Sequence, residues 1–248
     1  MASKDELIVY GRHPVVDVIR SGKPVDKLLL QQGIRGDFEK EVRHLCKEYE
    51  IPFKVVPKDR LAKFSRGNHQ GVIALLSPIQ YYKIEDVLPM IYEQSKVPLF
   101  LLLDEVTDVR NFGSIARSAE VLGANAIVIP SKGAARINAD ALKTSAGALS
   151  KIPVCRSSSL MKVVEYLQLS GIQVLASSLN ASSQLFDLDL ELPTAIIIGS
   201  EGEGVNPALL RKSDQQFIIP QVGETDSLNV AVATGVILYE VLRQRRQS

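Results

Sequence analysis

The chain has 248 residues, of which 46% are hydrophobic and 23% charged, as is typical of a globular protein with a substantial core. No run of residues approaches the roughly eighteen apolar positions that a membrane-spanning helix needs, and no signal peptide is visible. The two cysteines, Cys46 and Cys155, lie far apart and form no ligand pattern. The composition therefore predicts a cytoplasmic protein with no membrane partner and no metal site.

The net charge of +1 conceals an uneven distribution of charge along the chain. Residues 1–76 carry 14 Lys and Arg against 10 Asp and Glu, together with all three histidines. The remaining residues carry 15 Lys and Arg against 18 Asp and Glu. A mildly basic segment is compatible with a nucleic-acid partner, but solvated basic faces are common, so charge alone leaves both interpretations open.

Residues 1–77 are predicted to form a small α/β domain. In chain order we expect a strand at 8–10, a helix closed by Gly22, a strand at 25–33, a helix at 38–49, and strands at 52–56 and 71–76. A polar loop before the last strand places basic residues around Phe64. Cations beside an aromatic ring suit RNA, which is bound through phosphates and stacked bases, although an ordinary surface loop has the same composition.

Residues 78–96 contain two prolines and have mixed polarity, which predicts a linker with a short helix and a domain boundary near Pro78. From residue 97 to 248, apolar runs alternate with helical patterns. This part is therefore predicted to be an α/β domain with a parallel sheet that is covered on both faces. The predicted strands lie at 98–104, 126–129, 171–177, 195–198 and 217–219, and the predicted helices include one ending at Gly123, one in the Ala-rich segment 131–154, one at 161–167 and a long one entered at Ser227.

Two loops that follow predicted strands carry the polar residues of a candidate site. The first reads GSEGEG and contains Glu201 and Glu203, and the second reads QVGETDSLN and contains Ser227 and Asn229. Ligands of open α/β sheets bind where strands end in such loops. The glycine spacing fits neither GxGxxG nor the phosphate loop GxxxxGK(S/T), which argues against a dehydrogenase and an NTPase. The glycines would still let a ligand approach the backbone closely.

The helix after the first strand of this sheet contributes two further candidates. Asn111 is the expected N-cap, and Arg117, about one turn into the helix, could bind an anion beside free backbone N–H groups. Ser227 is expected to cap the last helix. The residues alone leave simpler roles open. Arg117 could be a solvated helix residue, Ser227 could only cap the helix, and Asn229 could only hold the loop in place.

Three segments, NFGSIARSAEVLGA, IIIGSEGEGV and IIPQVGETDSLNVAVATGVILYE, resemble in this order the three motifs of the SpoU-type SPOUT RNA 2′-O-ribose methyltransferases. The similarity covers about Val97 to Arg246. YGRHPV and NHQGV resemble the small ribosomal-protein-like RNA-binding domain of the same family. The two-domain form is most similar to the bacterial 23S rRNA guanosine-2′-O-methyltransferases.

The resemblance implies a domain whose C-terminal part is threaded into a trefoil knot, with an S-adenosyl-L-methionine site in the knotted loops. By motif position, Gly199, Ile219 and Leu228 are expected to contact the cofactor. The resemblance also implies a homodimer in which the last helix, here Ser227 to Arg243, packs at the interface.

The family's catalytic positions correspond to five residues of this chain: Asn111, Arg117, Glu201, Ser227 and Asn229. The implied reaction is attack of a ribose 2′-hydroxyl of RNA on the methyl group of the cofactor. A guanidinium, with a pKa above about 12, is hard to deprotonate, so a clamp on an RNA phosphate or on the hydroxyl suits Arg117 better than a base. Glu201 would then orient Arg117 or accept the proton.

Two positions depart from the family pattern. Ala231 stands where the third motif commonly has Ser, and Gln221 stands where Met is frequent.

Two alternatives to 23S rRNA methylation stay open. One is a tRNA 2′-O-ribose methyltransferase, although such enzymes often lack the N-terminal domain. The other is a non-catalytic RNA-binding assembly factor, which would not need the intact polar set.

Overall fold

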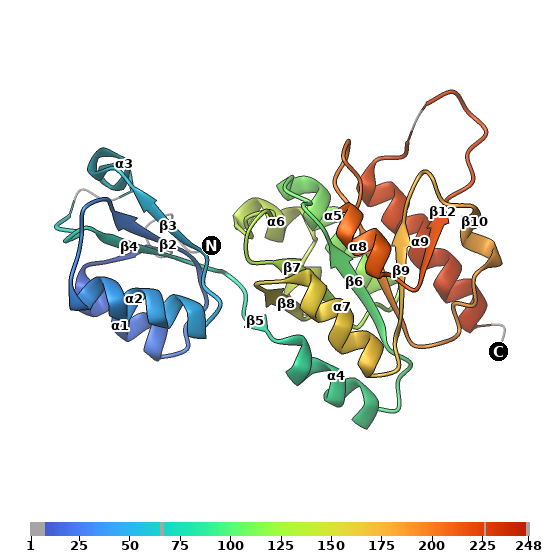
Figure 1. Cartoon of the computed structure of the whole chain (residues 1–248), viewed down its shortest axis with the longest axis horizontal. Coiled ribbons are helices and arrows are strands. Elements are labelled where there is room, and N and C mark those ends of the chain that lie inside the picture. Colours follow the sequence, from blue (N-terminus) through green and yellow to red (C-terminus); the bar gives the residue numbers. More distant parts are fainter. Residues whose placement is uncertain (1–7, 65–66, 226, 247–248) are drawn as a thin grey trace. The chain divides into compact units, whose positions relative to one another are not determined.

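The computed structural model describes residues 8–64, 67–225 and 227–246, and the chain divides into two units, Met1–Gln80 and Tyr81–Ser248 (Figure 1). Each unit has its own sheet and its own buried core. The prediction of an α/β fold with a parallel-sheet domain is confirmed.

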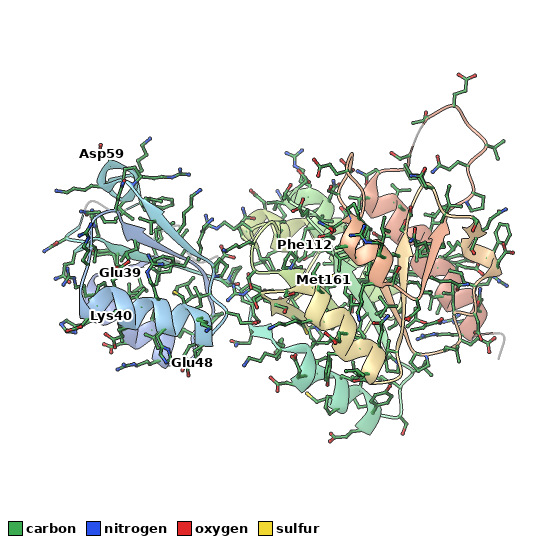
Figure 2. The ribbon with its side chains drawn as sticks, viewed as in Figure 1. Glu39, Lys40, Glu48, Asp59, Phe112 and Met161 are labelled. Carbon is green, nitrogen blue, oxygen red and sulfur yellow. The ribbon has the colours of Figure 1, made fainter. Side chains whose placement is uncertain are left out.

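The first unit is a four-stranded mixed sheet with helices on both faces. Its elements are β1 (Ile8–Tyr10), α1 (Arg12–Arg20), β2 (Val25–Gln31), α2 (Asp37–Glu48), β3 (Phe53–Val56), α3 (Lys58–Ala62) and β4 (Val72–Leu76). The strand order is β1-β4-β2-β3, with β2 and β3 parallel and the other pairs antiparallel. Leu28 and Leu30 of β2 pack against α1 and α2, whereas Leu29 points to the opposite face and packs against Leu61 of α3. Figure 2 shows the charged Lys40 and Glu48 of α2 projecting from its outer side.

The two N-terminal segments that carried the resemblance lie side by side in this unit. The backbone N–H of Arg12, at the start of α1, donates to Gln70 Oε1 over 3.0 Å. The Gly71 N–H donates to His69 Nδ1, also over 3.0 Å. Gly71 has φ +80°, a left-handed conformation that strains residues with a side chain, so this turn favours glycine.

The second unit is built on an eight-stranded, all-parallel sheet. Its strands are β5 (Tyr81–Tyr82), β6 (Leu99–Leu103), β7 (Ala126–Pro130), β8 (Val154–Ser157), β9 (Gln173–Ser177), β10 (Ser183–Gln184), β11 (Thr194–Ile198) and β12 (Gln215–Ile218). Its helices are α4 (Ile84–Glu93), α5 (Val109–Val121), α6 (Ala139–Thr144), α7 (Leu160–Leu169), α8 (Pro207–Lys212) and α9 (Val230–Arg245), with short 3₁₀ helices η1 (Ala148–Ser150) and η2 (Leu185–Asp187). The strand order is β10-β12-β9-β11-β6-β7-β8-β5. The trefoil knot stays a prediction, because strand order alone does not define threading.

The central strands β6 and β11 are buried along their whole length, as their continuous apolar runs predict. Phe100 and Leu102 of β6 face a cluster that includes α4, α7 and α8. The alternating residues of β6 face the other side, where α5 packs against β7 and α9 packs against α5 (Figure 1). Phe112 of α5, labelled in Figure 2, is fully buried in this second layer.

The segment expected to be a linker is largely built into the second unit. β5 pairs with β8 at the edge of the sheet, and α4 buries Ile84, Val87, Leu88 and Ile91 in the core. Pro89 lies inside α4. The helix is thus an integral part of the domain core.

Two helix starts differ from the prediction. Asp108, not Asn111, caps α5, because its side chain accepts from the N–H groups of Arg110 and Asn111. Asn229, not Ser227, caps α9, and its Oδ1 accepts from the N–H of Ala231 over 2.9 Å. Arg117 therefore lies two turns into α5 instead of one.

The last five residues, QRRQS, have the polar and basic composition of a frayed tail, but the structure anchors the start of this segment. Arg245 donates to four backbone carbonyls, those of Val97, Pro98, Leu190 and Leu192, over 2.8–3.1 Å. Its burial among these groups lowers the pKa of the guanidinium from its ordinary value. These bonds tie the end of α9 to the start of β6. Residues 247–248 of the expected tail lie outside the described residues.

Candidate active site

A cavity of about 520 Å³ opens at the carboxyl ends of β9, β11 and β12. Its walls are residues 177–180 after β9, 198–205 after β11, Ile218, Ile219 and Gln221 around the end of β12, and Ser227, Leu228, Val230 and Ala233 at the start of α9, together with Leu210. A volume of this size falls within the roughly 300–1,000 Å³ of small-molecule and cofactor sites. We refer to it as the loop cavity.

The loop after β11, residues 199–206, folds back on itself to form one wall. The Gly204 N–H donates to the Ser200 carbonyl over 3.1 Å, and the two residues form an isolated antiparallel bridge. A Cβ on Gly199 would lie 2.0 Å from the Gly204 carbonyl carbon and 2.2 Å from the Val205 nitrogen. The absence of a side chain at Gly199 is therefore what allows the wall to close.

The three residues expected to contact a cofactor all line the loop cavity. Gly199 lies at its base after β11, Ile219 follows β12, and Leu228 precedes α9. Sequence reasoning missed residues 177–180, which form the wall after β9. The signal was present, since SSLN is a run of polar and turn-forming residues directly after a predicted strand.

Beside the loop cavity, three of the five expected catalytic side chains form one hydrogen-bonded cluster. Asn229 Nδ2 donates to Glu201 Oε1 over 2.5 Å and to Asn111 Oδ1 over 3.1 Å. Asn111 Nδ2 donates to the same Glu201 oxygen over 3.2 Å. The Val230 N–H supplies a third donor to that oxygen over 3.3 Å. We call Asn111, Glu201 and Asn229 the amide–carboxylate cluster.

Helix ends position this cluster. The Asp108 cap places Asn111 in the first turn of α5, and Asn229 is itself the cap of α9. Asn229 thus uses its oxygen for the helix and its amide nitrogen for the cluster. Glu201 lies against the N-terminus of α9, where the helix dipole favours a negative charge.

The other two expected catalytic residues lie outside the cluster. Arg117 is exposed on α5, and within the described part of the chain no hydrogen bond or ion pair joins it to Glu201. Orientation of Arg117 by Glu201, one of the two expected roles, is therefore not seen in this arrangement. Ser227 is exposed and lines the loop cavity two residues before Asn229.

Neither a cluster of metal ligands nor a membrane-spanning helix is found among the described residues. Within residues 8–64, 67–225 and 227–246, no group of three or more His, Cys, Asp or Glu side chains could hold a metal ion. No helix in those ranges is both long and apolar enough to cross a bilayer. Both cysteines are buried, and neither forms a disulfide within the described residues.

The fold and the site define a class of protein: an α/β domain that binds a small molecule at the carboxyl edge of a parallel sheet, beside a polar cluster drawn from one loop and the starts of two helices. Comparison with known sequences then identifies the family. The chain belongs to the SpoU rRNA Methylase family, whose profile matches residues 98–239, and is thus a methyltransferase of the SpoU and TrmH type. Residues 8–82 match a second profile, RNA 2′-O ribose methyltransferase substrate binding.

Relatives and solved structures agree with this assignment. The Bacillus subtilis protein YacO, assigned to the TrmH family of tRNA/rRNA methyltransferases, is 34% identical over 237 residues, which cover 96% of this chain and 95% of YacO. The SpoU methyltransferase AviRb from Streptomyces viridochromogenes, solved with the cofactor AdoMet, has a TM-score of 0.62 at 27% identity, covering 97% of this chain and 91% of AviRb. A TrmH/SpoU tRNA modifying enzyme from A. aeolicus has a TM-score of 0.57 at 28% identity, covering 61% of this chain and 77% of the enzyme.

Proposed function

We propose that this protein transfers a methyl group from S-adenosyl-L-methionine to the 2′-hydroxyl of a ribose in RNA, and that its substrate is a guanosine of 23S rRNA in the cytoplasm. The observation that carries the proposal is the amide–carboxylate cluster. It joins residues from three distant segments beside a cavity of cofactor size: Asn111 and Glu201 are 90 positions apart in the chain, and Glu201 and Asn229 are 28 positions apart. The substrate-binding profile over residues 8–82 supports RNA ribose as the acceptor.

The loop cavity fits the proposed cofactor in size and in chemistry. Ile198, Ile219 and Leu228 offer apolar surface for a purine ring, and the glycine-rich wall exposes backbone groups that can read its edge. Gly199, Ile219 and Leu228 would hold the cofactor from three sides of the cavity. When bound, S-adenosyl-L-methionine supplies a methyl group on a positively charged sulfur that an oxygen nucleophile can attack.

The chain's own residues would bind and orient the RNA. Glu201 Oε1 is occupied by three N–H donors, so in this proposal Glu201 first serves to fix the two amides. Its second oxygen, Oε2, would accept the proton of the ribose hydroxyl. Arg117, whose guanidinium is exposed, would clamp an RNA phosphate, and Ser227 at the cavity rim would position the hydroxyl. Such positioning can lower the barrier to transfer by several kcal/mol.

The test uses methyl-labelled S-adenosyl-L-methionine with the full chain and with unmodified 23S rRNA, 16S rRNA and tRNA in parallel. We expect label on a ribose of 23S rRNA, which nuclease digestion then maps to one guanosine. Label on tRNA alone would replace the substrate and keep the reaction. Cofactor binding in calorimetry without transfer to any RNA, naked or in assembly particles, would contradict the proposed activity.

We also propose that the protein is a homodimer through α9. This helix leaves Val232, Val236 and Tyr239 exposed by 53%, 40% and 62%, and their spacing of four and three residues places them on one face. The neighbouring helix α5 adds Val121, which is 68% exposed. A second copy that covered this stripe would remove its apolar side chains from water.

Light scattering tests the dimer. The wild-type chain should have twice the mass of 27.2 kDa, and Tyr239→Glu should have the mass of one chain with an unchanged circular dichroism spectrum. Met90→Glu on α4 is the matched control, since Met90 is exposed by 55% on a different helix. A wild-type chain that stays monomeric at micromolar concentration would rule the dimer out.

A further inference from the structure

Asp104 is a nearly buried carboxylate that lies outside the loop cavity and outside the amide–carboxylate cluster. It directly follows β6 and is 8% exposed. Burying a carboxylate costs free energy unless hydrogen bonds compensate it. The hydrogen bonds that compensate for the burial of Asp104 therefore indicate which part of the structure it holds.

Asp104 forms hydrogen bonds at both ends of the loop 199–206, which is one wall of the loop cavity. The Asp104 N–H donates to the carbonyl of Ile198, where the wall leaves β11, over 2.8 Å. Asp104 Oδ2 accepts from the N–H of Asn206, where the wall enters α8, over 2.7 Å. Asn206 in turn caps α8 by accepting from the Ala208 N–H over 2.9 Å. The distance between the two ends of the wall is thus set by the backbone and side chain of a single residue.

We propose that Asp104 is a positioning residue for the cofactor: it holds the wall 199–206 closed around the loop cavity, and thereby also holds Glu201 in place. The inference rests on the proposed function, because it names a further residue that shapes the same site. The wall contains Gly199, Glu201 and Val205, all of which line the cavity. Asp104 also begins the short connection that leads to the Asp108 cap and to Asn111. One carboxylate therefore connects the cofactor wall with the segment that delivers the first amide of the cluster.

The chain offers a control in Asp214, which makes the same kind of hydrogen bond but, unlike Asp104, is exposed. This residue also accepts a backbone N–H through a carboxylate oxygen, that of Val174, over 2.7 Å, and it accepts from Gln168 Nε2 over 2.8 Å. It lies at the start of β9 and β12, at the opposite end of the strands from the loop cavity, and does not line the cavity. Removal of Asp214 should lower the stability of the domain without opening the cofactor wall.

The experiment measures S-adenosyl-L-methionine binding to the full chain by calorimetry. Asp104→Ala should weaken binding at least about tenfold, because a hydrogen bond to a charged group is lost. Asp104→Asn keeps an oxygen that can accept from Asn206, so it should bind within about threefold of the wild type. Asp214→Ala should lower the thermal midpoint and leave the dissociation constant unchanged. If Asp104→Ala does not fold, Asp104→Ser, whose shorter side chain cannot reach Asn206, takes its place with the same expected result.

Hydrogen exchange of the wall provides a readout that does not need the cofactor. The backbone amides of 199–206 should exchange faster in Asp104→Ala than in the wild type, and Asp214→Ala should leave them unchanged. A wild-type chain that fails to bind S-adenosyl-L-methionine would contradict the proposed function, and the exchange rates would still decide the role of Asp104. Wild-type binding and wild-type exchange in a folded Asp104→Ala variant would overturn the inference.

Discussion

Replacing Gly199 by Ala should open the cofactor wall while leaving the rest of the fold intact. The added Cβ would lie 2.0 Å from the Gly204 carbonyl carbon, 2.1 Å from its oxygen and 2.2 Å from the Val205 nitrogen. All three are backbone atoms, so no side-chain rotation can relieve the contact and the wall must move. Overpacking of this kind costs about 1–3 kcal/mol. Because about 1.4 kcal/mol corresponds to a factor of ten, cofactor binding should weaken by about fivefold to 140-fold.

Calorimetry with S-adenosyl-L-methionine measures this effect, and a glycine elsewhere gives the control. Gly223 lies in the loop between β12 and α9, and nothing lies within 4 Å of a Cβ built on it. Gly223→Ala makes the same chemical change and should bind the cofactor like the wild type. Circular dichroism should show both variants folded. A Gly199→Ala variant that binds as tightly as Gly223→Ala would refute the reasoning, because it would mean that the wall need not close for binding.

Three further predictions address the catalytic residues and the core. Arg117→Ala should reduce methyl transfer at least about a hundredfold and spare cofactor binding, since a phosphate clamp acts on the RNA alone; transfer at the wild-type rate would remove Arg117 from the site. Asn229→Ser keeps an oxygen that can cap α9 but loses the amide that donates to Glu201, so transfer should fall while the midpoint of urea unfolding changes little; parallel losses of stability and activity would contradict this separation. Burial, reinforced by the carboxylates of Glu85 and Asp86, raises the pKa of the Cys155 thiol to about 12. The unfolded chain therefore loses this proton first, and the thiol's contribution to stability is complete below about pH 9 and falls by up to about 1.4 kcal/mol per pH unit above it. Urea unfolding measures this effect in the wild type and in Cys155→Ala at pH 8 and pH 10.5. The free energy of unfolding should fall more between the two pH values in the wild type, and equal falls would contradict the raised pKa of the thiol.

The elements that the sequence predicts well are those whose local pattern reflects burial on both sides. The runs at β6 and β11 are apolar at every position because both faces of these strands are covered. The two-residue strands β5 and β10 and the six-residue helix α8 are too short to show any periodicity, so they escape such reasoning. The C-terminal segment shows a second limit of prediction from sequence. Its basic composition near Arg245 is typical of a solvated tail, and only the tertiary structure shows the four carbonyl groups to which Arg245 donates.

Helix starts show how tertiary contacts decide between locally equivalent residues. Ser227 and Asn229 are both good N-caps and lie two residues apart, so local propensity cannot choose between them. Asn229 has the additional option of donating to Glu201 and Asn111, which are distant in sequence. These bonds fix Asn229 at the start of α9 and leave Ser227 at the cavity rim. The residue types of the site could therefore be predicted, but the pairings between them could not.

The glycines of the wall have a different role in the structure from the one that the sequence predicts. From sequence, glycines at such a loop indicate that a ligand approaches the backbone closely. In the structure, the space beside Gly199 is filled by the loop's own backbone. Gly202 and Gly204 have open space around them and φ of +114° and +70°, so the reason for glycine there is the left-handed backbone. The shape of the wall therefore explains all three glycines. A ligand can contact the backbone surface that these glycines expose only when the wall is closed.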